Sequence, residues 1–472
     1  MVNGLSGERM LIALFIGIAL LIFMVMFTKI QAFLAMIICT VVIGVIGGMP
    51  LLNTTIELED GTTETFGIIN SITSGFGGTL GSIGIIIGFG VMMGQIFEVT
   101  GAAKRMAYTF LRVFGKGREE EALAFTGFLV SIPIFCDSGF IILSPIAKAL
   151  SKATKKSVIG LGAALAAGLV ITHSLVPPTP GPLGVCGIFG VDVGIYILVS
   201  LVLAIPMAIA CILYAKKVLA KKYFWIWGDD DLPHPTAYTQ PDYDAAFNMD
   251  MSDTPGAFES FAPLLLPIVL ILLNTVLSAV GLESGIFEFI IFLGQPIIAV
   301  GLGLILAIFT LGRRLDRNTC LKEMEKGMAS AGIIMLVTGA GGSLGQIIKD
   351  SGLGNYMANG LASAAVPMII LPLLISTAMR FIQGSGTVAM TTAASISAPI
   401  LNAAGVNPVL GCVACCVGSL FCSYFNDSYF WVVNRTLGVE EAKDQMRIWT
   451  VTTGIAWAVG VVEVVILSLI FH

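Results

Sequence analysis

Four ionisable residues lie at or beside interruptions in the long hydrophobic stretches of this chain. Asp137 and Asp427 carry carboxylates, His173 carries an imidazole and Arg380 carries a guanidinium group. A charge near the middle of a bilayer costs about 2.5–3.5 kcal/mol on insertion scales, so such residues mark binding or proton-transfer sites. Asp137, Asp427 and His173 are therefore candidates to take up a proton on one side of a membrane and release it on the other.

Each of these residues also has a structural interpretation. Either aspartate could cap a restarting helix and never titrate, and His173 could serve only as a buried hydrogen-bond donor. Arg380 could pair with a substrate carboxylate or with Asp427. Alternatively, its head group could extend to the membrane surface and only orient the chain.

The four residues fall at or beside places where Pro, Gly, Ser or Asn interrupts an apolar run. These places are 133–139, 172–182, 383–387 and 426–428. The prolines of the second place cannot all lie inside one helix, because each removes a backbone donor. Irregular backbone survives at membrane depth only inside protein or beside a wet cavity. We therefore expect the four places to meet at one pocket.

Such a pocket suits a small hydroxy acid. Helices that restart at a break aim unpaired N–H groups and positive dipole ends at the gap, which favours a carboxylate. Hydroxyl and amide side chains can bind the hydroxyl groups of a polyol or sugar acid. The predicted substrate-binding residues are Asp137, Ser138, Gly139, Thr172, His173, Ser174, Pro178, Thr179, Arg380, Gly384, Ser385, Gly386, Thr387, Asn426, Asp427 and Ser428.

Composition places the chain in a membrane. It has 472 residues, of which 56% are hydrophobic and 12% charged, about half the charge of a typical soluble protein. The net charge of -5 excludes a nucleic-acid binder built on basic patches. The sequence has no intact metal-ligand spacing and no Ser/His/Asp arrangement on a regular helix. It therefore gives no indication of an enzyme, a metal site or a cofactor.

The hydrophobic runs predict an all-α polytopic membrane protein. A single span needs about 20 apolar residues. Runs of this kind are 10–29, 31–49, 75–97, 193–214, 261–281, 287–311, 327–348 and 448–470. Four further apolar regions are too long for a single span and are interrupted by Gly, Pro, Asp, Asn or Ser: 122–150, 157–190, 360–402 and 408–434. We interpret 157–190 and 408–434 as discontinuous helices.

The positions of Lys and Arg set the predicted orientation. If 122–150 and 360–402 are re-entrant hairpins, 22 of the 25 basic residues lie on the cytoplasmic side, and only Arg9, Lys349 and Arg380 do not. The loop 50–74 holds acidic residues but no Lys or Arg, so it faces outward, as do both termini. Residues 102–114 read as an amphipathic helix at the inner surface of a bacterial inner membrane.

An internal repeat divides the chain. Gly94-Gln95-Ile96 recurs as Gly345-Gln346-Ile347, an offset of 251 residues, and the interrupted regions recur at nearly the same offset. The span 75–97 runs inward and its counterpart 327–348 runs outward, so the two repeats are inverted, as in secondary transporters. We predict an N-terminal repeat over 1–222, a cytoplasmic linker over 223–260 and a C-terminal repeat over 261–472.

Three motifs resemble signatures of the gluconate:proton symporter (GntP) family. They are VPPTPGP at 176–182, QGSGTVAM at 383–390 and NDSYFW at 426–431. The resemblance covers nearly the whole chain. It implies the fold of the ion-transporter superfamily, with a scaffold domain, a moving transport domain and two re-entrant hairpins. By the same analogy it implies a homodimer.

The resemblance also implies a substrate class, namely gluconate, related sugar acids or other small hydroxy acids. The first tip departs from the pattern of gluconate carriers, which have Glu followed by small apolar residues. Here Asp137 is followed by Ser138. A shorter carboxylate with a neighbouring hydroxyl changes the size and polarity of the pocket, and this leaves room for a hydroxy acid other than gluconate.

The sequence therefore predicts an elevator-type symporter that imports a small carboxylate with protons. Two other functions stay open at this point. Sodium could replace the proton, because unwound carbonyl groups and Asn, Ser and Thr clusters are present for it. A channel is the other alternative, although a channel should show a continuous polar stripe through several spans rather than polar groups gathered at breaks.

Overall fold

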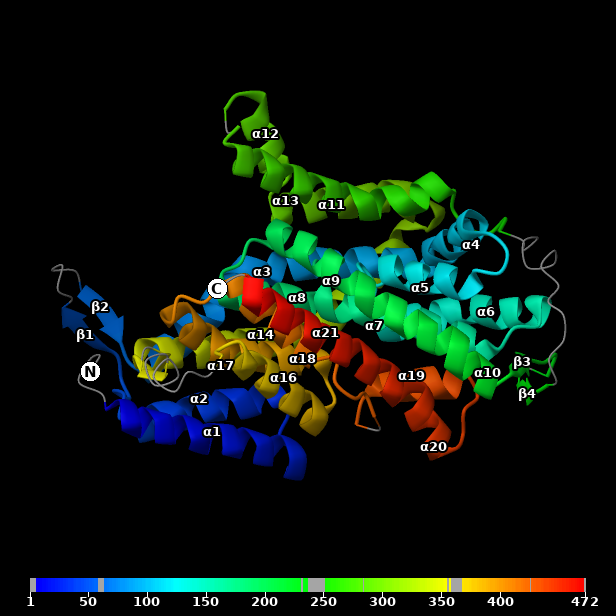
Figure 1. Ribbon diagram of the computed structural model, residues 1–472. Helices are drawn as coiled ribbons and strands as arrows, with labels where there is room; N and C mark the ends of the chain where they lie inside the picture. The colour runs from blue at the N-terminus through cyan, green and yellow to red at the C-terminus, as the bar shows by residue number, and fades with distance from the viewer. Residues whose placement is uncertain are drawn as a thin grey trace.

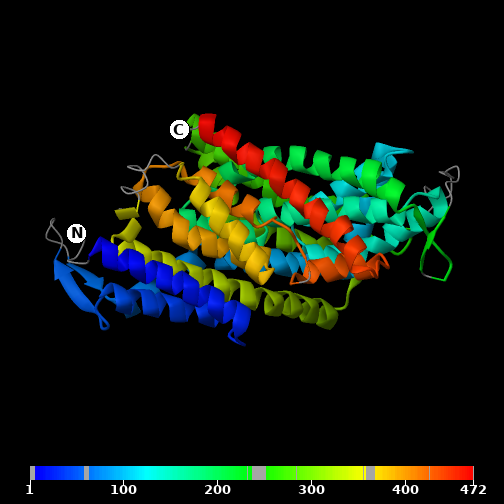
Figure 2. The ribbon, with the colours of Figure 1, turned by 60° about the horizontal axis from the view of Figure 1, so that its bottom comes forward.

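The computed structural model describes residues 6–57, 63–230, 232–236, 251–282, 284–354, 356–357, 367–424 and 426–470. Within these residues the protein is a bundle of helices that run along roughly one direction, with a small β-hairpin at each end (Figures 1 and 2). The hairpin β1–β2 and both termini lie toward one end, and the hairpin β3–β4 lies at the other.

The elements of the first half of the chain are α1 Gly7–Phe27, α2 Ala32–Gly47, β1 Thr54–Glu57, β2 Thr63–Phe66, α3 Ile68–Val99, α4 Ala102–Phe114, α5 Glu119–Val130, α6 Cys136–Thr154, α7 Val158–Leu175, α8 Pro180–Phe189, α9 Val193–Tyr214, a π-helical turn Ala215–Leu219, α10 Ala220–Lys222, β3 Trp225–Trp227 and β4 Pro233–Pro235. Both strand pairs are antiparallel, with Thr54 opposite Phe66 and Trp225 opposite Pro235.

The elements of the second half are α11 Ala257–Val280, α12 Ile286–Leu293, α13 Pro296–Thr310, a 3₁₀ turn Gly312–Arg314, α14 Arg317–Asp350, α16 Ile370–Gln383, α17 Gly386–Ala403, α18 Pro408–Gly418, α19 Ser428–Thr436, α20 Ala442–Gln445, a π-helical turn Met446–Thr450 and α21 Val451–Ile470. Each half thus contains a long helix, a pair of helices joined by a tight turn, an interrupted helix and a closing helix.

The prediction of an integral membrane protein is confirmed in its main point. Among the described residues, eight helical stretches are long and apolar enough to cross a bilayer: Gly7–Met24, Ile68–Val99, Val158–Phe189, Val193–Lys222, Ala257–Ser278, Pro296–Arg314, Arg317–Asp350 and Ala442–Ile470. Many of their large apolar side chains, such as Phe15, Val202 and Phe309, are exposed, as expected for a surface in contact with lipid.

Two expected boundaries were wrong. The run 287–311 is two helices, α12 and α13, because Pro296 cannot donate a helical hydrogen bond and instead occupies the first turn of α13. The outward loop expected over 50–74 contains β1 and β2, and α3 already begins at Ile68. The region 223–260, predicted as a linker, contains β3 and β4, and α11 begins at Ala257; residues 237–250 lie outside the described part.

The two long helices α3 and α14 pack along one another through the middle of the bundle. At their contact, a Cβ atom added to Gly75 would lie 2.4 Å from the carbonyl oxygen of Gly342, and one added to Gly342 would lie 2.4 Å from that of Gly75. Only glycine allows so close an approach of two backbones. The pair therefore sets the spacing of the two halves.

The first tight turn lies between α5 and α6, and these two helices return to the end at which they began. The ammonium group of Lys156, just after α6, lies 2.7 Å from carboxylate oxygens of both Glu119 and Glu120 at the start of α5. The glutamate side chains are 0% and 4% exposed. Burial by itself would lower the pKa of Lys156, but the two carboxylates raise it above its usual value.

Replacing Lys156 with Met should destabilise the protein by about 3–5 kcal/mol, because two buried carboxylates would lose the cation that bridges them. The measurement is thermal unfolding of purified protein in detergent. Lys152→Met is the control, since its partner Asp229 is fully exposed and such pairs contribute about 0–1 kcal/mol. Because the pKa of Lys156 is raised, the contribution of this ion pair should persist at neutral pH and vanish only as the pH rises through that raised pKa. Equal unfolding temperatures for the two variants would contradict this role.

Candidate substrate site

Four interruptions of the helices meet around one cavity of about 520 Å³, called here the site cavity. The helices α6, α17 and α19 begin at it, and α7 ends beside it. Of the sixteen predicted residues, eleven line it: Asp137, His173, Ser174, Arg380, Gly384, Ser385, Gly386, Thr387, Asn426, Asp427 and Ser428. Its volume is in the range that fits a small organic molecule.

The other five predicted residues are close to the site cavity but do not line it. Pro178 and Thr179 border a narrow pocket that shares His173 with the site cavity. The hydroxyl of Thr172 donates to the carbonyl of Gly168 at 3.2 Å. Gly139 packs against Leu169, and Ser138 is half-buried in the first turn of α6.

The proline-rich break positions α8. Pro177 and Pro178 occupy the interruption itself, whereas Pro180 and Pro182 lie in the first turn of α8, where a missing N–H costs no helical hydrogen bond. The chain therefore leaves α7 at Leu175 and restarts as α8 at Pro180, after four intervening residues. As a result His173 and Ser174 face the site cavity from the last turn of α7.

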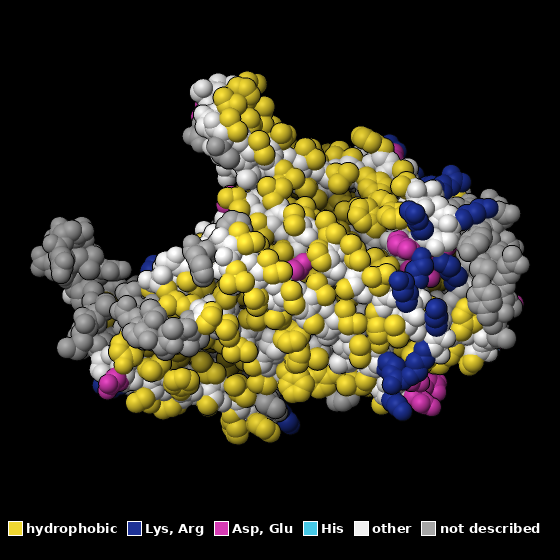
Figure 3. Space-filling view, viewed as in Figure 1, with side chains coloured by type: hydrophobic (Ala, Val, Ile, Leu, Met, Phe, Trp, Pro, Cys, Tyr) yellow, Lys and Arg dark blue, Asp and Glu magenta, His cyan; other side chains and the backbone are white. Residues whose placement is uncertain are grey.

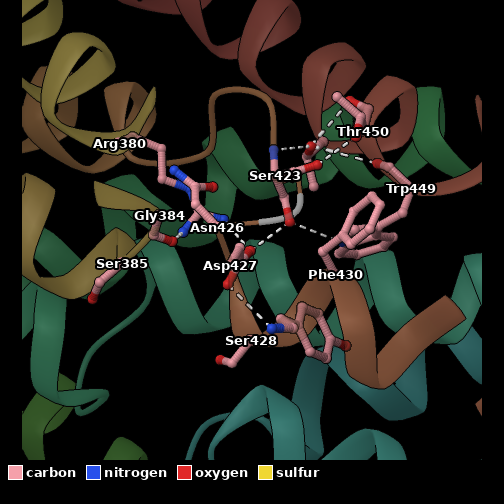
Figure 4. A network of polar contacts seen from close by, with 12 residues as sticks. Arg380, Gly384, Ser385, Ser423, Asn426, Asp427, Ser428, Phe430, Trp449 and Thr450 are labelled. Atoms are coloured by element: carbon pink, nitrogen blue, oxygen red, sulfur yellow. Dashed lines mark hydrogen bonds and ion pairs between the residues drawn. The ribbon is translucent and has the colours of Figure 1, made fainter. Parts of the chain in front are cut away.

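A buried ion pair joins the second tight turn to the break before α19. Nη2 of Arg380 lies 2.5 Å from Oδ2 of Asp427, and the two side chains are 5% and 8% exposed. Nη1 of Arg380 donates to the carbonyl of Gly384 at the turn. Figure 4 shows these groups converging from separate segments of the chain.

Asp427 has two further donors. Its Oδ1 accepts from the backbone N–H of Tyr429 at 3.1 Å, so it is the N-cap of α19. Its Oδ2 also accepts from the hydroxyl of Ser423, which in turn accepts from the indole N–H of Trp449 at 2.8 Å. The capping interpretation of Asp427 and its pairing with Arg380 therefore both hold.

Asp137 and His173 are less completely bonded. Oδ2 of Asp137 accepts a long hydrogen bond of 3.4 Å from the hydroxyl of Ser428. Within the described part of the chain, Oδ1 of Asp137, Nδ1 of His173 and Nε of Arg380 are buried without a hydrogen-bond partner. These three atoms are therefore available to a ligand or a proton.

The helix starts favour an anion. The hydroxyl of Ser385 caps α17 by accepting from the N–H of Val388, which leaves the N–H groups of Gly386 and Thr387 without helical partners. The first turns of α6 and α19 reach the same space. The unpaired N–H groups and positive ends of three helices thus converge on the site cavity.

The sequence did not predict the residues on the opposite wall of the site cavity. Ile333, Ile334 and Val337 of α14 face the four interruptions across the site cavity. They lie on a regular helix of apolar residues, so no motif distinguishes them from residues that face lipid. The other lining residues not predicted are Phe135, Cys136, Val170, Val388, Ser419 and Tyr429.

Comparison with known proteins assigns the family. Residues 9–470 match the profile of the GntP family permeases. The chain belongs to this family. A protein described only as an uncharacterized permease from Haemophilus influenzae is 46% identical to it, over 98% of this chain and 92% of its own. A gluconate permease from Pseudomonas aeruginosa is 33% identical, over 99% of each chain.

A solved structure has the same fold as this GntP family permease. It is that of Neisseria gonorrhoeae MtrF, described as illuminating a class of antimetabolite efflux pumps. The TM-score is 0.63, over 96% of this chain and 97% of the other, at 15% identity. The likeness shows a shared transporter fold and carries no information about substrate. The predicted family and the prediction of a transporter rather than an enzyme are confirmed.

Gly384, at the turn between α16 and α17, allows a test of how the site cavity is held together. Its φ is +81°, and a Cβ atom added there would lie 2.2 Å from the carbonyl oxygen of Asn426. Gly384→Ala should therefore displace the break before α19 and destabilise the protein by about 1–3 kcal/mol beyond the cost of the positive φ. Thermal unfolding measures the effect. Gly405→Ala is the matched control, because Gly405 has a φ of +72° and open space around it.

Proposed function

We propose that this GntP family permease is an elevator-type symporter that imports gluconate, or a related small hydroxy acid, together with protons. The observation that carries the proposal is the charge of the site cavity. Asp137 and Asp427 supply two carboxylates against the single guanidinium of Arg380. With both aspartates ionised, the cavity holds one excess negative charge, which opposes the entry of an anion.

Protonation of Asp137 would remove that obstacle. Two like charges about 4 Å apart repel by about 4 kcal/mol at an effective dielectric constant of 20, which is enough to weaken binding by roughly three orders of magnitude. Asp427 pairs with Arg380 and also accepts from Ser423 and from the N–H of Tyr429. Asp137 contacts no cation within the described residues and has an oxygen without a partner. The proton and the anion would therefore enter together.

The substrate would bind by its carboxylate at Nε of Arg380 and at the N–H groups of Gly386 and Thr387. Its hydroxyl groups would contact Ser385, Asn426, Ser428 and the other polar side chains of the site cavity. His173, with an unpartnered Nδ1, would contact the substrate or pass the proton toward Asp137. The Asp137-Ser138 pair at the first tip leaves a hydroxy acid other than gluconate as a candidate substrate.

The architecture that we propose is two inverted repeats, over 1–222 and 261–472, joined by the linker 223–260. The matching order of elements supports the repeats, and the contact of Lys156 with Glu119 and Glu120 supports a re-entrant hairpin at α5–α6. In the same proposal α16–α17 is the second hairpin. The broken helices and hairpins form the transport domain, the long helices contribute to the scaffold, and the permease is a homodimer.

The orientation that we propose puts both termini outside. Lys and Arg side chains gather at the end of the molecule that carries β3–β4 (Figures 1 and 3), which supports placing that end in the cytoplasm. The opposite end carries β1–β2 and both termini. In this orientation α14 runs outward from Arg317 to Asp350.

Asp137→Asn should abolish proton-driven accumulation of gluconate in proteoliposomes, because the residue can no longer gain or lose a proton. Counterflow exchange should persist in this variant, since exchange needs no net proton movement. Asp427→Asn should instead lose both activities, because Arg380 would be left buried without its partner. Accumulation against a gradient by Asp137→Asn would refute the coupling role.

Uptake into the same proteoliposomes can distinguish proton coupling from sodium coupling. We expect uptake of radiolabelled gluconate in sodium-free buffer with an inward pH gradient, and its collapse when a protonophore is added. Uptake that requires sodium and ignores the pH gradient would favour the sodium-coupled alternative. Uptake that never exceeds the external concentration under either gradient would favour a channel.

A further inference from the structure

A second cavity of about 530 Å³ lies between α3, α8, α14 and α17 and is separate from the site cavity. Its polar lining includes Ser74, Thr79, Ser82, Gln346, Lys349 and Asn402. Glycines of α3 and α14 leave the space open, and a Cβ atom added to Gly78 would meet nothing within 4 Å. The cavity is as large as the site cavity and is also lined by hydroxyl and amide groups.

Three helices connect the two cavities. The helix α17 contributes Thr387 to the site cavity and Asn402 to the second cavity, and α14 contributes Val337 to the first and Gln346 to the second. The helix α8 follows the break beside His173 and reaches the second cavity in its last turn. The second cavity therefore lies farther toward the end of the molecule where α14 ends.

Small side chains pack between the cavities. A Cβ atom added to Gly184 of α8 would lie 3.1 Å from the methyl groups of Thr338 and Thr391. Thr338 is fully buried, and its hydroxyl has no partner within the described residues.

Lys349 supplies a cation at the second cavity. Its side chain is exposed, and no described carboxylate pairs with it. The neighbouring Asp350 is turned away, because it accepts from the hydroxyl of Ser71 at 2.5 Å and from the amide of Gln346 at 2.7 Å. The ammonium group is therefore available to an anion from solvent.

The remaining polar side chains of the second cavity carry hydroxyl and amide groups, which both donate and accept hydrogen bonds. The helices α8, α14 and α17 all end near it, but most of the last carbonyl groups of α14 and α17 are already bonded, as that of Lys349 is to Gly352 and that of Asn402 to Gly405. The hydroxyl and amide side chains therefore suit the hydroxyl groups of a polyol, and Lys349 suits its carboxylate.

We propose that the second cavity is an outer recruitment site for a polyhydroxy carboxylate, whose carboxylate pairs with Lys349 and whose hydroxyls bond to Gln346, Asn402 and the hydroxyl side chains of α3. The inference rests on the proposed function, which supplies both the orientation and the class of substrate. Substrate bound here would lie at the outer end of α17, which begins at the site cavity.

The first test is the kinetics of gluconate uptake into cells or proteoliposomes. Lys349→Gln should raise KM about tenfold with Vmax within about twofold, and the effect should shrink at high salt because the exposed cation is screened. Lys349→Arg should restore KM to within about threefold. Gly78→Phe should raise KM by filling the cavity, whereas Gly77→Phe, also in open space but outside the lining, should not.

The second test is chemical access in intact cells. Lys349→Cys should react with a membrane-impermeant, negatively charged thiol reagent, and gluconate should slow the reaction more than sorbitol does. The same protection should persist when Arg380→Gln is added, since the second cavity is separate from the site cavity. No reaction from outside, or no protection, would overturn the proposal.

The outcomes distinguish this inference from the function on which it rests. Wild-type protein that takes up no gluconate or other hydroxy acid would refute both. Active wild-type protein with unchanged KM in both Lys349→Gln and Gly78→Phe would refute the recruitment site alone. If one of these variants fails to give folded protein by thermal unfolding, the other decides.

Discussion

The ion pair between Arg380 and Asp427 holds the centre of this permease together. It joins the turn between α16 and α17 to the irregular segment before α19, neither of which could hydrogen-bond to lipid. Arg380 also binds the carbonyl of Gly384, and Asp427 binds Ser423 and the start of α19. Removing one member of a buried pair typically costs about 3–5 kcal/mol, so each segment depends on the other for its position.

The ion pair between Arg380 and Asp427 also determines the role that we propose for Asp137. Once Asp427 and Arg380 neutralise each other, the charge of the site cavity is decided by Asp137, whose carboxylate accepts only a long hydrogen bond from Ser428 within the described residues. In the mechanism that we propose, an anion that enters a cavity with one uncompensated carboxylate would bring or await a proton. In this account, coupling between substrate and proton follows from a charge count and needs no special proton pathway.

Helix direction separates the two cavities chemically. Three helices present their N-termini to the site cavity, which therefore offers N–H donors and a positive field. At the second cavity α8, α14 and α17 end, the polar side chains are hydroxyls and amides, and Lys349 is the cation. The binding of a hydroxy acid that we propose for each cavity would therefore use a different balance of groups.

By itself the sequence determined that the chain crosses a membrane, where its helices break, and which polar residues lie at the breaks. The length of a hydrophobic run, and the effect of Pro, Gly or a charged residue within it, depend on neighbouring residues in the chain. They can therefore be recognised from the sequence. Only the tertiary structure decided that Arg380 pairs with Asp427, that Ile333 and Val337 form the facing wall, and that a second cavity opens beside Lys349. Those facts depend on which faces of regular helices meet. The sequence of an apolar helix does not show whether a given face contacts lipid, another helix or a cavity.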